Sequence, residues 1–236
     1  MKYAAILFDL DGTLLPMDQD VFTKSYFKLL AAKMAPYGYA PEPLVNGVWA
    51  GPAAMVKNNG SCTNEEAFWA CFEARMGARV QAHRPLFDEF YRVEFQQARA
   101  FCGFNPLSRE CVALAKALGL RVALATNPLF PSFATESRIR WAGLEPEDFE
   151  FFTSYENSRT CKPNPDYYRE LLVRMNLRAE QCLMVGNDAE EDMIAETLGM
   201  GVFLLTDCLI NHQNREIVWP HGGFDALMDF LRAQVQ

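Results

Sequence analysis

The 236-residue chain lacks the patterns typical of disulfide-rich, membrane-spanning or nucleic-acid-binding proteins. Its seven cysteines are odd in number and form no C-x-x-C pair, which favours reduced thiols over a disulfide framework or a zinc site. No apolar run approaches the roughly 20 residues of a transmembrane helix, and the first run is too short for a signal peptide. Basic clusters that would hold a phosphate backbone are also absent. We therefore expect a cytoplasmic protein that binds neither membrane nor nucleic acid.

Apolar and acidic residues are plentiful. Hydrophobic residues make up 50% of the chain and aromatic residues 13%, so it can bury a sizeable core plus a smaller domain. Thirty acidic against 22 basic residues give a net charge of -8, for which ordinary solubility is a sufficient explanation. This charge does not exclude a small phosphorylated substrate, because a metal ion and one lysine could supply the positive charge.

Helical periodicity dominates residues 16–100. A first helix is expected to bury one face that carries Phe22, Tyr26, Leu30 and Met34. Prolines and a glycine between 36 and 43 predict a break, and Thr63 and Glu66 predict the capped start of a second helix. A third helix is expected to start near Pro85. The aromatic residues in these stripes are expected to pack in a core and not to form a ligand site.

Helix and strand patterns alternate in the rest of the chain. Strands are expected at 4–8, 120–125, 149–153, 181–185 and 201–205, and helices at 112–118, 132–142, 165–175, 188–198 and 224–231. This alternation predicts an α/β fold, a doubly wound parallel sheet with helices on both faces. The predicted core comprises residues 1–15 and 101–236, and residues 16–100 form an inserted all-helical domain.

Two carboxylates follow the first predicted strand, in the segment Asp9-Leu10-Asp11-Gly12-Thr13. Gly12 lets the backbone turn away after them. Charge beside a buried strand is costly unless it is compensated, and a divalent cation is one natural partner. Alone, the segment could equally be an ordinary turn at a solvated strand end.

Polar residues recur after later strands. Thr126 and Asn127 follow the strand 120–125, and Asn187 and Asp188 follow the strand 181–185. The carboxyl ends of parallel strands share one edge, so these residues should meet in one crevice, which Lys162 is placed to join. Each alone has an ordinary explanation as a turn, a surface lysine or a helix cap.

Another observation favours a site over these separate explanations. Asp188 and Asp192 would lie one turn apart on a helix, and such a like-charge pair is unfavourable unless a metal ion or a lysine neutralises it. The joint occurrence of all these residues, in this order, favours a functional site.

Together these segments resemble the four signature motifs of the haloacid dehalogenase superfamily. The motifs are Asp9-Leu10-Asp11-Gly12-Thr13, Thr126-Asn127, Lys162-Pro163, and Gly186-Asn187-Asp188 with Asp192. The resemblance covers the whole core, and the helical insert matches the position and size of that family's C1 cap. It points to the phosphatase branch, which includes phosphoglycolate phosphatase and β-phosphoglucomutase.

The resemblance implies a role for each matching residue. Asp9 would be the nucleophile that forms an aspartyl-phosphate, and Asp11 the general acid and base. Thr126, Asn127 and Lys162 would hold the transferring phosphoryl group.

The resemblance also implies a Mg²⁺ cofactor. Asp9, Asp188 and the backbone carbonyl of Asp11 would bind the ion, and Asp192 would orient the site from behind. Many family members have Gly-Asp where this chain has Gly186-Asn187-Asp188, which leaves open whether Asn187 joins the metal ligands. Hard oxygen ligands of this kind suit magnesium.

The expected function is therefore a magnesium-dependent phosphatase that acts on a small phosphorylated metabolite beneath a closing cap. Dehalogenases that resemble this fold lack an acid at the position of Asp11, so Asp11 favours phosphate chemistry. A phosphomutase is the nearest alternative, because it uses the same residues but returns the phosphoryl group to a sugar. A non-catalytic binding protein is a further alternative, although it would have no need of Asp9, Asp11, Lys162 and Asp188 together.

Overall fold

A computed structural model describes residues 2–234 of the chain. The sheet contains β1 (Ala5–Phe8), β2 (Arg121–Leu124), β3 (Cys182–Gly186), β4 (Gly201–Leu205) and β5 (His221–Gly222). The α-helices are α1 (Gln19–Met34), α2 (Pro41–Val56), α3 (Asn64–Met76), α4 (Arg79–Arg92), α5 (Pro106–Ala117), α6 (Ser132–Trp141), α7 (Pro165–Met175) and α8 (Phe224–Ala233). Short 3₁₀ helices are η1 (Ala35–Tyr37), η2 (Glu94–Phe101), η3 (Pro146–Asp148), η4 (Ala179–Gln181) and η5 (Met193–Leu198).

The five strands form one parallel sheet in the order β2-β1-β3-β4-β5. Every residue of β1 is fully buried, which explains why this strand is a continuous apolar run. Ile6 and Phe8 pack into the hydrophobic cluster on one face, and Ala5 and Leu7 pack into the cluster on the other. This alternation buries both faces of the sheet.

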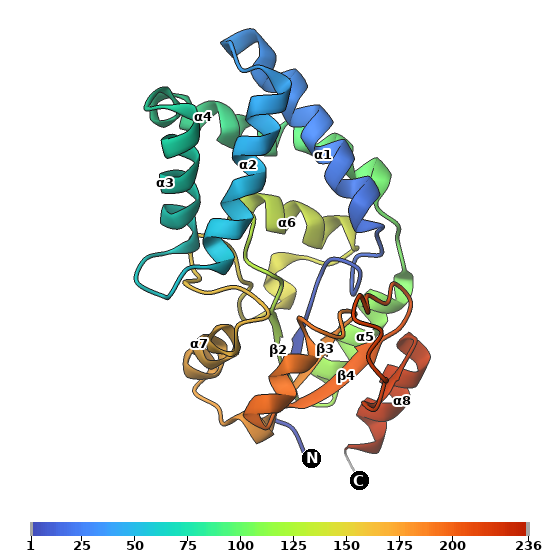
Figure 1. Ribbon diagram of the computed structural model, residues 1–236. Helices are drawn as coiled ribbons and strands as arrows, with labels where there is room; N and C mark the ends of the chain where they lie inside the picture. Colours follow the sequence, from blue (N-terminus) through green and yellow to red (C-terminus); the bar gives the residue numbers. More distant parts are fainter. Residues whose placement is uncertain (1, 235–236) are drawn as a thin grey trace.

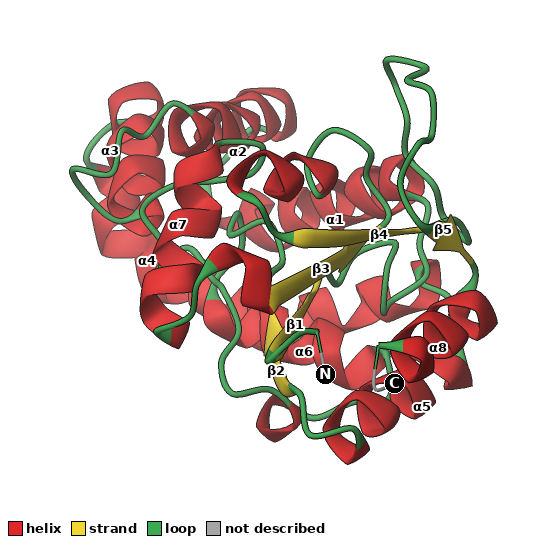
Figure 2. Cartoon of the chain, turned by 90° about the horizontal axis from the view of Figure 1, so that it is seen from below, coloured by secondary structure: helices red, strands yellow, loops and turns green. Residues whose placement is uncertain are grey.

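Helices cover the sheet on both sides, as Figure 2 shows from below. Residues of α5, α6 and α8 contribute to the cluster that contains Ile6 and Phe8. Residues of α7 and η5 contribute to the cluster that contains Ala5 and Leu7. The predicted doubly wound α/β sheet is therefore confirmed.

Helices α1 to α4 gather at one end of the molecule, at the top of Figure 1, and the sheet lies below them. The buried face of α1 carries the four residues that the sequence predicted, Phe22, Tyr26, Leu30 and Met34. Thr63 and Glu66 form the predicted capping box of α3.

The two chain segments that lead into and out of this helical region lie side by side. The backbone N–H of Gly103 donates to the carbonyl of Pro16 at 2.7 Å, and Met17 pairs with Cys102 in an antiparallel bridge. The helical region thus leaves the sheet and returns to it at one place.

Several elements differ from those that the sequence predicts. Helix α2 begins where the sequence predicts a break. Pro41 and Pro43 both lie in its first turn, where a helix needs no N–H donor. Helix α4 starts six residues before Pro85, which the helix accommodates in its interior. Residues 188–192 form turns before the short η5, and the strand expected at 149–153 is reduced to one bridge between Leu124 and Phe152.

Two features concern the whole chain. Within residues 2–234, every helix is too short or too polar to cross a lipid bilayer. All seven cysteines are free thiols, of which Cys111, Cys161 and Cys182 are buried and the other four partly exposed. This arrangement is consistent with the expected reduced cysteines.

Candidate active site

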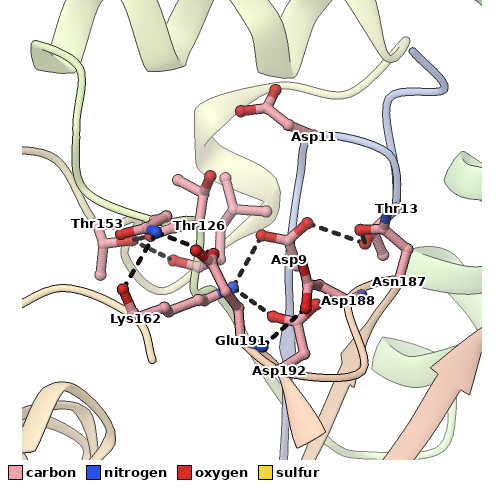
Figure 3. Close-up of polar contacts among 12 residues, drawn as sticks. Asp9, Asp11, Thr13, Thr126, Thr153, Lys162, Asn187, Asp188, Glu191 and Asp192 are labelled. Atoms are coloured by element: carbon pink, nitrogen blue, oxygen red, sulfur yellow. Dashed lines mark hydrogen bonds and ion pairs between the residues drawn. The ribbon is translucent and has the colours of Figure 1, made fainter. Parts of the chain in front are cut away.

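The polar residues that follow β1, β2 and β3 meet at one edge of the sheet (Figure 3). Phe8, the last residue of β1, pairs with Leu124 of β2 and Val185 of β3, so the three strands end at nearly the same level. Asp9, Thr126 and Asn187 therefore line a single cavity of about 370 Å³, together with Asp11, Asn127, Asp188 and Asp192. The other predicted site residue, Lys162, reaches the same place from the loop before α7.

The loop after β1 is shaped around Asn187. Gly12 has φ of 86°, and a side-chain Cβ at this position would collide with the amide nitrogen of Asn187. The hydroxyl of Thr13 lies 2.9 Å from Oδ2 of Asp9 and 3.0 Å from Oδ1 of Asn187. Asn187 in turn donates to the carbonyl of Cys208 at 2.6 Å. Asn187 thus fixes the loop that carries Asp9.

Lys162 connects the carboxylates of Asp9 and Asp192. Its Nζ lies 2.9 Å from Oδ1 of Asp9 and 2.6 Å from Oδ1 of Asp192, and the residue is only 1% exposed. Burial lowers the pKa of Lys162, but the carboxylates of Asp192 and Asp9 outweigh burial and hold its pKa well above the usual value. Lys162 therefore remains charged and neutralises part of the acidic site.

Asp188 and Asp192 lie in the turns that follow β3, where they do not form the like-charge helical pair that the sequence predicted. Oδ1 of Asp188 accepts the backbone N–H groups of Glu190 and Glu191 at 2.7 and 2.8 Å. Asp192 accepts the backbone N–H of Asp188 on one oxygen and the ammonium of Lys162 on the other. The cation that balances Asp192 is thus a lysine, one of the two alternatives that the sequence left open.

Thr126 and Asn127 follow β2 and make different hydrogen bonds. The carbonyl of Thr126 accepts the hydroxyls of Thr153 and Tyr167 at 2.6 and 2.9 Å. The Thr126 hydroxyl makes no hydrogen bond with the described residues, and Thr126 lines the cavity. Asn127 donates to Glu191 at 2.9 Å, and its own Oδ1 is buried without a partner among residues 2–234. Both side chains therefore have unused hydrogen-bonding capacity at the cavity.

Asp11 points away from Asp9, as Figure 3 shows, and forms an ion pair with Arg138 of α6. Arg138 is 1% exposed, and its guanidinium also contacts the carbonyl of Ala134, the hydroxyl of Thr135 and the ring of Phe130. Burial raises the pKa of Asp11, although the charge of Arg138 opposes the rise. Oδ1 of Asp11 has no partner among the described residues, so half of this carboxylate remains free.

The donor atoms at this edge fit a magnesium ion. Oδ2 of Asp188 accepts no hydrogen bond from the described residues, and burial raises the pKa of this carboxyl although backbone N–H groups oppose the rise. Among residues 2–234, no three side chains of Asp, Glu, His or Cys are grouped to hold a metal by themselves. Magnesium is usually held by one or two carboxylates plus substrate phosphate and water, and it does not require such a cage.

Sequence reasoning missed several residues that surround these atoms. Arg138 lies 127 positions from its partner Asp11, and an arginine within a helical pattern gives no local signal of burial. The sequence predicts Thr13 only as part of a motif, and Glu191 is not among the predicted site residues. Burial raises the pKa of Glu191 to about 7, and its hydrogen bond to Asn127 joins the loops after β2 and β3.

Comparison with known proteins identifies related sequences and folds. The family model of the haloacid dehalogenase-like hydrolases matches residues 3–195, whereas no curated protein matches the chain. A predicted phosphoglycolate phosphatase from Haemophilus somnus 129pt is 20% identical, with 99% of each chain covered and a TM-score of 0.57. A 2-haloacid dehalogenase from Pseudomonas syringae pv. tomato DC3000 is 18% identical, with 99% of this chain and 100% of that chain covered and a TM-score of 0.63.

A third solved structure is CbbY from Rhodobacter sphaeroides in complex with phosphate. It is 18% identical, with 94% of this chain and 95% of that chain covered and a TM-score of 0.58. At such identities the three structures show a shared fold, and the family assignment rests on the sequence match.

Proposed function

The chain belongs to the haloacid dehalogenase-like hydrolases, and we propose that it is a magnesium-dependent phosphatase of a small phosphorylated metabolite. The observation that carries this proposal is that two carboxylates of one loop, Asp9 and Asp11, line the same cavity. The environments of the two acids differ. Asp9 is paired with Lys162, whereas Asp11 is paired with Arg138 through one oxygen, has a raised pKa and keeps its other oxygen free of partners among the described residues.

The second acid favours phosphate esters over organic halides. The alkoxide that leaves a phosphate ester needs a proton, whereas a halide leaves without one. Asp11 is the acid nearest to Asp9 in sequence. Burial raises its pKa, so its carboxyl is easier to protonate than an exposed one, and one of its oxygens has no partner among residues 2–234 and can carry the proton. The similarity of this fold to that of a 2-haloacid dehalogenase does not contradict phosphate chemistry, because the fold alone does not determine the reaction.

In the first step, a carboxylate oxygen of Asp9 forms a bond to phosphorus while the bond to the ester oxygen breaks. Asp11 gives its proton to the departing oxygen, so a neutral alcohol leaves and Asp9 carries the phosphoryl group. In the second step, water attacks phosphorus and gives its proton to Asp11. Inorganic phosphate is released, and both acids return to their starting states.

Residues in and behind the cavity wall hold the phosphoryl group during transfer. The buried ammonium of Lys162 fixes the nucleophile and offsets negative charge beside the phosphate. The unused hydroxyl of Thr126 can donate to a phosphoryl oxygen, and Asn127 lies next to it on the cavity wall. Phosphoryl transfer depends mainly on such positioning and charge neutralisation.

We assign the magnesium site to the carboxylates of Asp9 and Asp188 and to the backbone carbonyl of Asp11. When bound, the ion would neutralise charge on the phosphate and allow the anion to approach Asp9. Asp192 holds both Lys162 and the backbone of Asp188 in place, and Asn187 acts through Thr13 on the orientation of Asp9.

We also propose that residues 16–100 form a cap domain over a core made of residues 1–15 and 101–236. Helices α1, α2 and α3 supply part of the cavity wall opposite the strand ends, so closure of this region would exclude water from the phosphate. The paired segments at Pro16 and Gly103 are the natural hinge for such a movement.

The proposal is tested by measuring release of inorganic phosphate from a panel of phosphate monoesters. We expect hydrolysis that requires added magnesium and stops on chelation, and loss of hydrolysis in the Asp9→Asn variant with an unchanged circular dichroism spectrum. Release of free phosphate also separates hydrolysis from transfer to a sugar. A folded protein that releases no phosphate in magnesium, or one that is unaffected by chelation, contradicts the proposal.

A further inference from the structure

The cavity above the strand ends has two chemically distinct walls. One is the polar edge of the sheet, with the acids described above. The other is contributed by the helices and is largely aromatic, formed by Phe22, Tyr26 and Phe27 of α1, Trp49 of α2, Phe68 of α3 and Tyr91 of α4. The sequence interpretation of these aromatic stripes as core packing alone is therefore incomplete, because several of their rings also face the cavity.

The aromatic wall has few free polar groups. The hydroxyls of Tyr26 and Tyr91 lie 2.8 Å apart and bond to each other, which leaves mainly ring surface toward the cavity. Phe27 lies against Trp49 with their ring centroids 5.6 Å apart. Gln19 and Thr23, near the start of α1, are the uncharged polar residues of this wall. A wall of this kind suits an apolar group better than the hydroxyls of a sugar.

The charges around the cavity are also one-sided. Its described lining includes five acids, Asp9, Asp11, Asp188, Glu191 and Asp192, and one basic residue, His212, but neither lysine nor arginine. Lys162 and Arg138 approach from behind the acids, and both are buried in ion pairs. A second anionic group on the substrate, such as a carboxylate, would find no cation on the aromatic wall to compensate its loss of water.

We propose that the substrate is a phosphate monoester of an apolar alcohol, one that carries an aromatic ring or a comparable group and no second anionic group. This inference rests on the proposed phosphatase function. The phosphoryl group would lie at Asp9, and the apolar part would pack against Phe27, Trp49 and their neighbours. The cavity volume of about 370 Å³ is near the lower end of the range for small-molecule sites, which suits a single ring system.

The test compares kcat/KM for benzyl phosphate, ethyl phosphate and phosphoglycolate at saturating magnesium. All three release primary alcohols, so the main differences are apolar area and charge. We expect benzyl phosphate to exceed ethyl phosphate by about tenfold or more, the scale of discrimination that an apolar pocket provides, and phosphoglycolate to fall below ethyl phosphate. A preference for phosphoglycolate, or equal rates on benzyl and ethyl phosphate, overturns the inference.

A matched pair of variants tests whether the aromatic wall is responsible. Trp49 is 61% exposed at the cavity, and Phe104 is 62% exposed outside the cavity lining, so both substitutions should leave the fold intact. We expect Trp49→Ala to lower kcat/KM for benzyl phosphate several-fold with little change for ethyl phosphate, and Phe104→Ala to change neither. An equal loss on both esters in Trp49→Ala contradicts the inference.

Failure of the inference and of the proposed function give different results. If the wild-type protein hydrolyses ethyl phosphate and phosphoglycolate in magnesium but does not prefer benzyl phosphate, the phosphatase proposal stands and the substrate class is wrong. If the folded protein hydrolyses none of the three esters, nor p-nitrophenyl phosphate, the phosphatase proposal fails and the inference fails with it.

Discussion

Replacement of Arg138 by methionine tests whether the buried ion pair with Asp11 stabilises the protein. Arg138 is 1% exposed, and Asp11 is its ion-pair partner. Methionine keeps much of the length and apolar contact of arginine but removes the charge. The variant therefore leaves the carboxylate of Asp11 in the same surroundings without its counter-ion.

The expected loss follows from the burial of the two partners. Removal of one member of a buried ion pair costs about 3–5 kcal/mol, because the other charge is left uncompensated. The side chain of Asp11 is 21% exposed, so water can offset part of the loss, and the lower figure of about 3 kcal/mol applies. In a chain of this size, each kcal/mol of lost stability lowers Tm by about 2–4 °C, so a loss of about 3 kcal/mol should lower Tm by about 6–12 °C.

Arg140, two positions further along α6, provides the matched control. Its side chain is 48% exposed and lies 3.2 Å from Glu145 and 3.4 Å from Glu136, both of which are exposed acids. Surface pairs of this kind contribute about 0–1 kcal/mol, so Arg140→Met should lower Tm by no more than about 4 °C. Thermal unfolding followed by circular dichroism, in the same buffer, measures both variants.

A double variant distinguishes loss of the charge pair from loss of packing. In the Arg138→Met background, Asp11→Asn removes the uncompensated charge, so the double variant should be more stable than Arg138→Met alone. The reasoning is refuted if Arg138→Met melts within 2 °C of Arg140→Met, or if the double variant is no more stable than the single one.

Four further results are expected. Asp9→Asn should lower kcat by at least ~10³-fold in phosphate release, because an amide cannot replace the nucleophile, and near wild-type turnover would refute that role. Asp11→Asn should slow the same reaction by about 10²–10⁴-fold through loss of proton transfer, and an unchanged rate would show that another group is the acid. Lys162→Met leaves two buried carboxylates without their ammonium, so Tm should fall by about 6 °C or more; an unaltered melting curve would contradict the assigned ion pairs. Burial raises the pKa of the Cys111 and Cys161 thiols to about 12, so iodoacetamide at pH 8 should label them only after denaturation; mass spectrometric detection of either adduct in the native protein would contradict their burial.

Much of the fold could be predicted from local patterns. The stripe from Phe22 to Met34 identified α1, because four large apolar residues at helical spacing have one natural arrangement. The same reasoning failed at α2, where Pro41 and Pro43 are compatible with the first turn of a helix but are usually read as a break. It also failed at residues 188–192, which form hydrogen-bonded turns around Asp188 and Asp192 in place of a helix.

The part of the candidate site that could be predicted consists of residues that directly follow a strand. Asp9, Thr126 and Asp188 share the property of following a strand, and parallel strands bring such residues to one edge. Their catalytic and metal-binding roles stay predictions. Arg138 could not be found in this way, because its partner Asp11 comes from a distant segment and no spacing rule relates a residue of α6 to the loop after β1.

The pairing of the segments at Pro16 and Gly103 has a consequence for how such a protein can change. The chain leaves the core and returns to it at one point. Residues 17–102 therefore form a long insertion whose two ends are held together by backbone pairing. The entropic cost of closing a loop rises only slowly with its length, so the size of this insertion can change with little effect on the stability of the core. Under the proposed function, a graft at these two positions would replace the aromatic wall of the cavity and leave the acids at the strand ends unchanged.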